Sequence, residues 1–182
     1  MQPITIGTKV YDLSHLSIIR RKAVAKLRQS EKEVLIEVHF SCHCWSRKPL
    51  TNEPIPSTHL VPDGSKVHPR NRIFCESRYE LSLELPRLVD EMLTTNHRVY
   101  YTDKDNIVRI DWVAPIVAGT KPEQYYLFMK VEKKTPKGEA KHVKIFVESA
   151  YPESVMYENP VYGKPVSFNQ LLGDCWELRY PK

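Results

Sequence analysis

Residues 125–149, YYLFMKVEKKTPKGEAKHVKIFVES, decide the fold class of this chain. Two runs rich in β-branched and aromatic residues, 125–133 and 143–149, lie on either side of the polar turn Thr135–Gly138, and this is the pattern of two β-strands. In the second run every other residue is β-branched and apolar, as in a strand with one face in a core: Val143, Ile145 and Val147. Because the link between the runs is short, we expect the two strands to pair antiparallel.

The same period of two extends toward the N-terminus. Two further strands are expected over Arg98–Thr102 and Ile107–Val113, with a polar turn at 103–106. The four strands together predict an antiparallel meander. Ahead of them, Ser77–Glu80 fits the Ser-x-x-Glu capping box that opens a helix. Pro86 interrupts the helical pattern that follows, so we expect a kink or two short helices at that point.

The N-terminal part has a different pattern. Apolar residues recur at helical spacing within 15–29, which predicts a helix, and 34–40 is rich in apolar and β-branched residues, which predicts a strand. Residues 46–72 contain many prolines and little periodicity, so we expect a long loop. The predicted fold class is α+β, with an N-terminal helix and strand followed by helices packed on a four-stranded antiparallel meander. We expect one domain over 1–182, made of a helix and strand at 1–45, a long loop at 46–76, a helix and sheet core at 77–152 and a C-terminal tail at 153–182.

Size and composition indicate an ordinary globular domain. The chain has 182 residues and a mass of 21.3 kDa, with 41% hydrophobic and 27% charged residues, which excludes a disordered, collagen-like or coiled-coil chain. No apolar run reaches the length of a membrane span, so no membrane partner is expected. The first residues contain no apolar signal segment, so we expect a cytoplasmic protein.

The four cysteines leave two interpretations open. In a reducing compartment disulfides are not expected. Cys42 and Cys44 flank His43, and Cys75 together with one of three histidines could complete a zinc site: His39, His59 or His68. However, the Cys-x-Cys spacing is tighter than that of known zinc knuckles, and buried free thiols explain the residues equally well. We therefore predict no metal ligands and no cofactor.

The positive charge is compatible with a polyanionic partner. The net charge is +5 and the pI is about 8.9. Candidate RNA-binding residues are Arg20, Arg21, Lys26 and Arg47, although the first three also suit a solvated helix face. Aromatic side chains could stack on bases or simply fill the core: Trp45, Tyr100, Tyr101, Trp112, Tyr125 and Tyr126.

The sequence lacks the strong catalytic motifs. It has no Gly-rich phosphate loop, no His-Glu-x-x-His, no Gly-x-Ser-x-Gly and no dinucleotide fingerprint. Polar residues do lie where helices and strands begin or end, among them Arg78, His142 and Ser149. Metal-independent RNA cleavage needs a base, an acid and a cation for the phosphorane, and side chains of these types can supply them. The alternative is a half-exposed strand histidine and a serine that caps the backbone.

Several stretches resemble uncharacterised proteins of phages and integrated mobile elements: Phe40–Arg47, Phe74–Pro86 and Val147–Pro152. The order of helix and then meander over 77–152 also resembles the barnase–colicin–RelE type of small metal-independent ribonucleases. That resemblance implies RNA cleavage, often by a toxin, and its active positions carry over to Arg78, His142 and Ser149.

Three functions therefore remain in competition. The first is a small phage- or mobile-element-type ribonuclease acting on RNA without a metal. The second is a non-enzymatic protein-interaction module, such as a phage accessory protein or an inhibitor of a host factor, which would use the 46–72 loop and the open face of the sheet. The third is a zinc-stabilised nucleic-acid-binding domain.

Overall fold

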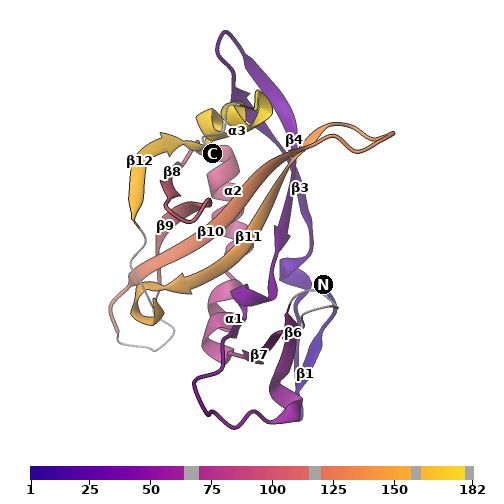
Figure 1. Cartoon of the computed structure of the whole chain (residues 1–182), viewed down its shortest axis with the longest axis vertical. Coiled ribbons are helices and arrows are strands. Elements are labelled where there is room, and N and C mark those ends of the chain that lie inside the picture. Colours follow the sequence, from indigo (N-terminus) through magenta and orange to yellow (C-terminus); the bar gives the residue numbers. More distant parts are fainter. Residues whose placement is uncertain (64–69, 115–119, 157–160, 179–182) are drawn as a thin grey trace.

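The computed structural model describes residues 1–63, 70–114, 120–156 and 161–178. Its largest element is a seven-stranded mixed sheet in the order β12-β8-β9-β10-β11-β4-β3 (Figure 1). The strands in that order are β12 (Tyr162–Ser167), β8 (Arg98–Thr102), β9 (Ile107–Val113), β10 (Glu123–Lys134), β11 (His142–Pro152), β4 (Glu31–Phe40) and β3 (Ile19–Lys26).

The four predicted strands form the middle of this sheet. β8, β9, β10 and β11 are consecutive antiparallel neighbours, as tight connections require. A bulge between Phe128 and Met129 interrupts the pairing of β10 with β11. β4 then pairs parallel with β11, and β3 pairs antiparallel with β4. The predicted fold class, helices packed on a four-stranded meander, is therefore wrong, because the meander is extended on both sides into a mixed sheet.

The predicted helix over 15–29 is also absent, because its centre is strand β3. Ala23 and Ala25 are buried, whereas Lys22, Val24 and Lys26, which alternate with them, are exposed, and this is the period of a strand. Alanine, arginine and lysine all favour helices in isolation. Pairing of all eight residues of β3 with β4 outweighs that local preference.

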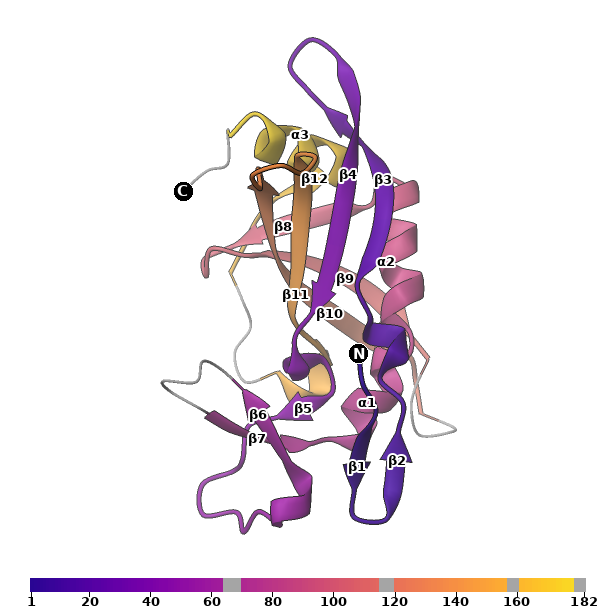
Figure 2. The same cartoon turned by 90° about the vertical axis from the view of Figure 1, so that its right-hand side faces the viewer.

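A second, smaller sheet occupies much of the segment predicted to be a loop. β5 (Ser46–Arg47), β7 (Arg70–Phe74) and β6 (Leu60–Asp63) pair in that order, and a 3-10 helix, η3 (Ser57–His59), precedes β6. Near them lies a hairpin of β1 (Ile4–Ile6) and β2 (Lys9–Tyr11), and both views place these pieces at the end of the molecule remote from the C-terminal helix (Figures 1 and 2). A further 3-10 helix, η1 (Ser14–Leu16), leads from β2 to β3.

Two short helices meet at Pro86, as the sequence predicts. α1 (Glu76–Ser82) and α2 (Leu85–Thr94) are separate, and the proline lies in the first turn of α2, where its missing N–H costs nothing. Ser77 does not form the expected cap, because α1 already begins at Glu76. The residue before it, Cys75, makes no capping hydrogen bond with its side chain.

The core lies between one face of the large sheet and the helices α2 and α3 (Phe168–Trp176) (Figure 2). α2 buries an apolar stripe of five residues, each contributing about 1.5–3 kcal/mol: Leu85, Leu88, Val89, Met92 and Leu93. α3 approaches β3 so closely that a Cβ on Gly173 would lie 1.8 Å from the carbonyl oxygen of Lys26. Glycine is therefore required at this crossing.

One charged residue of β9 is enclosed in this core. The Arg109 side chain is fully buried and donates hydrogen bonds to the carbonyl oxygen of Leu88 and to the carboxylates of Glu91 and Asp111. Its charge is thus neutralised by its own neighbours, as burial requires. Within the described residues, no helix is long and apolar enough to cross a membrane.

Candidate functional site

The predicted catalytic cation, Arg78, is a structural residue in the described fold. It lies in α1, is only 7% exposed, and its Nη1 donates to the carbonyl oxygens of His43 at 3.2 Å and Ser46 at 3.0 Å. Its guanidinium also lies 5.0 Å from the ring centre of Tyr151. These contacts hold the turn that follows β4 and leave the cation deep in the protein.

The other two predicted catalytic residues lie far apart on one strand. His142 is the first residue of β11, with Nδ1 3.2 Å from the carbonyl oxygen of Ala140 and Nε2 3.7 Å from the carboxylate of Glu37. Ser149 lies seven residues further along β11, which is roughly 23 Å at the rise of an extended strand. The structure therefore does not bring Arg78, His142 and Ser149 together.

The predicted RNA-binding cations are mostly engaged within the protein. Arg20 pairs with Glu37 at 2.7 Å, Arg21 with Asp90 of α2 at 3.1 Å and Arg47 with Glu53 at 2.5 Å. Because Arg20 and Arg21 are neighbours on a strand, their side chains point to opposite faces of the sheet. Lys26 is exposed at the end of β3.

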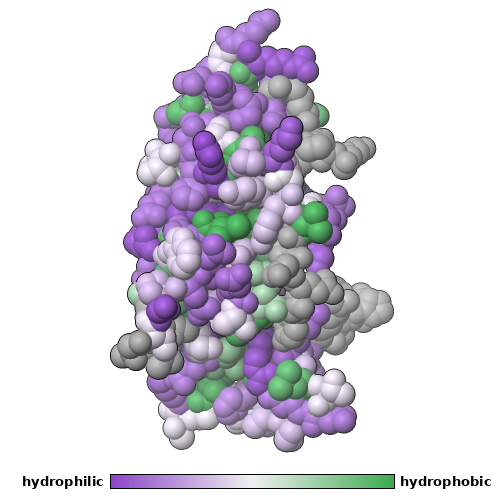
Figure 3. Space-filling view, turned by 90° about the vertical axis from the view of Figure 1, so that its left-hand side faces the viewer, coloured by the Kyte–Doolittle hydropathy of each residue, from purple (hydrophilic) through white to green (hydrophobic). Residues whose placement is uncertain are grey.

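Most of the candidate aromatic residues are also enclosed. Trp45 and Tyr125 belong to the main core, and a smaller cluster on the other face of the sheet buries Val108, Tyr126 and Phe128 against Tyr100 and Tyr151. On the side of β8 and β12, hydrophobic side chains appear as small separate patches among hydrophilic ones (Figure 3). The indole of Trp112 differs, because this residue is 62% exposed.

Two of the seven candidate zinc ligands converge, with one aspartate that sequence reasoning missed. Cys42 and His43 lie in the 3-10 helix η2 (Cys42–Cys44), and their donor atoms and those of Asp63 in β6 all lie within 4.8 Å of one another. Cys44 is fully buried, with Sγ directed at the carbonyl oxygen of Val147. The remaining three described candidates contact other groups, since Cys75 lies beside Ser77, His39 beside Glu37 and His59 beside Thr58. His68 lies outside the described residues.

Burial controls the protonation of this cluster. It lowers the pKa of His43, and it raises the pKa of the Cys42 thiol to about 11, with the Asp63 carboxylate adding to the rise. Without a metal ion the thiol is therefore protonated at neutral pH, and Cys42 is a poor nucleophile.

A shallow hollow with a basic rim lies on the open face of the large sheet. This Phe146 hollow has a volume of about 200 Å³ and is lined by Lys130, Glu132, Lys144 and Phe146. The Lys130 ammonium pairs with Glu148 at 3.0 Å, and the Lys144 ammonium lies 5.9 Å from the ring centre of Phe146. The positive charges of this hollow are thus partly engaged within the sheet.

A larger groove lies where the junction of α1 and α2 meets the end of β9. This Trp112 groove has a volume of about 440 Å³ and is lined by Glu80, Leu81, Glu84, Arg87, Trp112, Val113 and Ala114. Arg87 is engaged by Glu84 at 2.9 Å and by Glu91 at 2.6 Å. Glu80 is exposed and, within the part of the chain that the structure describes, its carboxylate has no hydrogen bond or ion pair.

The model of the YjaZ family matches residues 3–176. The chain belongs to the YjaZ family. No curated protein and no solved structure matches it. The YjaZ match extends from just before β1 to the end of α3, so the Trp112 groove and the cluster around Cys42 both lie inside the family's domain. The likenesses to phage proteins and to barnase–colicin–RelE ribonucleases, and the cytoplasmic location, stay predictions.

Proposed function

We propose that this protein is a non-enzymatic interaction module that binds a lysine- or arginine-bearing segment of a protein partner in the Trp112 groove. The observation that carries the proposal is a groove of about 440 Å³ that is lined both by Trp112, which is 62% exposed, and by Glu80, whose carboxylate has no partner among the described residues. An enzymatic proposal lacks comparable support, because the predicted catalytic residues His142 and Ser149 lie seven residues apart along β11.

The chemistry of the groove favours a cationic side chain. The flat face of an indole attracts an ammonium or guanidinium group. A tryptophan contributes most to the free energy of binding when the partner covers it and excludes water. Two glutamates line the groove against one arginine, and that arginine is held by Glu84 and Glu91. The Glu80 carboxylate is therefore available to a cation that reaches the indole.

The groove is also built on a rigid support. α2 is anchored in the core by five buried residues, and Val113 at the end of β9 is 4% exposed. A binding surface on such elements needs little reordering, which lowers the entropic cost of association. The groove lies outside the 46–72 segment that the sequence indicated for an interaction module.

Isothermal titration of the full chain tests the proposal with three probes. These are an end-blocked peptide in which arginine alternates with glycine, the same peptide with glutamate for arginine, and a single-stranded RNA oligonucleotide. We expect binding of the arginine peptide alone, and loss of that binding in Trp112→Ala. Binding of the RNA with no binding of the arginine peptide would favour a nucleic-acid partner and overturn the proposal, as would arginine-peptide binding that survives Trp112→Ala.

A further inference from the structure

A cluster of three side chains of types that can bind a metal ion joins the seven-stranded sheet to the three-stranded sheet. Cys42 and His43 follow β4 of the large sheet, whereas Asp63 ends β6 of the small sheet. His43 Nε2 lies 2.8 Å from Asp63 Oδ2, and Cys42 Sγ lies 3.6 Å from Asp63 Oδ1. This cluster is separate from the Trp112 groove and plays no part in the proposed function.

The backbone of η2 places the possible ligand atoms of two consecutive residues, Cys42 and His43, close to Asp63. The Ser41 hydroxyl caps η2 by accepting a hydrogen bond from the backbone N–H of His43 at 3.0 Å. Arg78 holds the carbonyl oxygens of His43 and Ser46 from the other side. The backbone that carries Cys42 and His43 is therefore held by contacts that do not involve Asp63.

We propose that Cys42, His43 and Asp63 bind one zinc ion and leave a fourth coordination position for water. A thiolate, an imidazole and a carboxylate are all donors that zinc accepts in tetrahedral sites. With bonds of about 2.0–2.3 Å, neighbouring donors around tetrahedral zinc lie roughly 3.3–3.7 Å apart. The Cys42–Asp63 distance of 3.6 Å already meets this spacing, and the hydrogen-bonded His43–Asp63 pair has to open by about 0.5 Å.

Binding of zinc at the cluster releases a proton. The thiol of Cys42 releases its proton to solvent when its sulfur binds the ion. The geometry, which brings donors from two sheets together, carries the inference.

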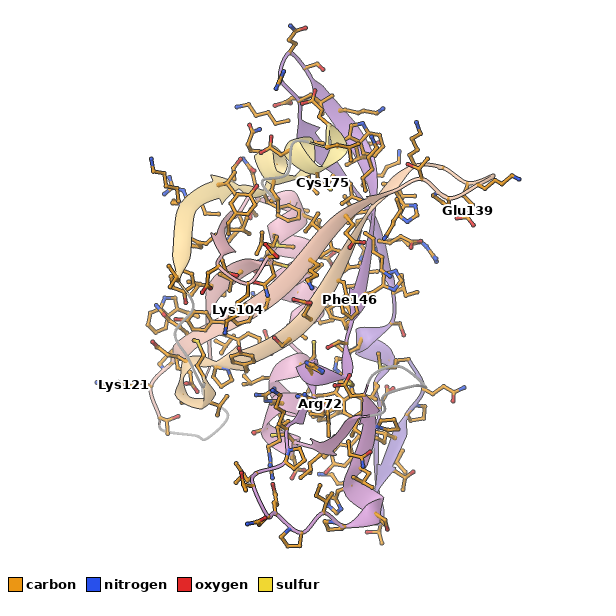
Figure 4. The ribbon with its side chains drawn as sticks, viewed as in Figure 1. Arg72, Lys104, Lys121, Glu139, Phe146 and Cys175 are labelled. Carbon is orange, nitrogen blue, oxygen red and sulfur yellow. The ribbon has the colours of Figure 1, made fainter. Side chains whose placement is uncertain are left out.

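The guanidinium of Arg72 lies close to the proposed site and disfavours a bound cation. Arg72 is 5% exposed, and its Nη1 lies 4.0 Å from Asp63 Oδ2, while its Nε and Nη2 donate to the hydroxyl and carbonyl oxygens of Ser46. Figure 4 shows Arg72 in the lower part of the molecule, with the small sheet. Its positive charge weakens the affinity for zinc, because it already compensates part of the negative charge of Asp63.

Cobalt substitution tests the site on the full chain, purified without a histidine tag and stripped with a chelator. Cobalt bound to a thiolate gives a ligand-to-metal charge-transfer band. We expect this band in the wild type at one ion per chain, its loss in Cys42→Ser, and at least tenfold weaker zinc binding in Asp63→Asn. Cys75→Ser is the matched control, since Cys75 is also half-buried and its Sγ lies beside the Ser77 hydroxyl.

A stability measurement guards against variants that do not fold. Zinc is expected to raise the thermal midpoint of the wild type and of Cys75→Ser and to leave that of Cys42→Ser unchanged. A charge-transfer band that survives Cys42→Ser, a band that depends on Cys75, or the absence of any band in the wild type would overturn the proposal.

Discussion

Two hollows on the surface are each lined by an exposed aromatic residue and by charged residues, but their charges have opposite signs and different neighbours. In the Phe146 hollow, Lys130 is paired with Glu148 and the Lys144 ammonium already lies over the ring. In the Trp112 groove, Glu80 has no ion pair among the described residues, and the indole is 62% exposed, against 36% for Phe146. An exposed charge contributes to recognition only when its own protein has not already neutralised it.

The largest expected effect is that of Trp112→Ala. The affinity for the arginine peptide should fall at least tenfold, about 1.4 kcal/mol, because the cation loses the face of the indole. The free energy of unfolding should change by less than about 0.5 kcal/mol, since the side chain is mostly exposed. Titration calorimetry and urea unfolding measure the two quantities, and a large loss of stability would contradict the description of Trp112 as a surface residue.

A charge reversal in the groove should have the next largest effect. Glu80→Lys replaces an attractive charge with a repulsive one and should weaken peptide binding about fivefold to tenfold. Glu139→Lys is the control, because it makes the same change at the tip of the β10–β11 hairpin, away from the groove (Figure 4). Equal losses in the two variants would show a response to net charge alone.

The pairing of charges on the open sheet face should appear in the pH dependence of stability. The guanidinium of Arg20 beside Glu37 lowers the pKa of that carboxyl below its ordinary value. The pair therefore stabilises the fold above the ordinary pKa of a glutamate and stops doing so as the pH falls through the lowered pKa of Glu37. Arg20→Gln should cost up to about 1 kcal/mol at pH 6, a cost that disappears in acid. A cost that persists at the lowest pH would contradict this pairing.

The smallest expected effect is that of Phe146→Ala. Affinity for the arginine peptide should stay within about twofold of the wild type, because the rim of this hollow is basic. The same titration series measures it. A loss similar to that of Trp112→Ala would place the peptide on the sheet face instead.

The strands of residues 98–152 could be predicted because their signals are local. Alternating side chains and short polar turns specify β8 to β11 without knowledge of the rest of the chain. The strand β3 could not be predicted in this way, because its alanines and basic residues favour a helix and only pairing with β4 overrides them. The small sheet was not predicted either. The many prolines of its segment indicate a loop, although the segment contains three short strands.

The candidate sites were harder to predict than the fold. The sequence identified Trp112 as an aromatic residue of a strand. It did not show that this residue is exposed, because the pairing of β8 with β9, which is at Ile107 and Val108, is known only from the fold. Glu80 carried only a capping signal, and helix α1 begins before it without that cap. Asp63 reaches Cys42 and His43 through the folding of β6 beside β7, and no sequence spacing reveals that contact.

The indole signals of the protein test the central claim most directly. The chain has three tryptophans, Trp45, Trp112 and Trp176, whose indole N–H groups give separate resonances in a proton–nitrogen NMR spectrum. Titration with the arginine–glycine peptide is predicted to shift the Trp112 indole and the backbone amides of residues 80–85 and Arg87, and to leave Trp45 unchanged. An unshifted Trp112 indole while amides around Lys130, Lys144 and Phe146 move would contradict the account.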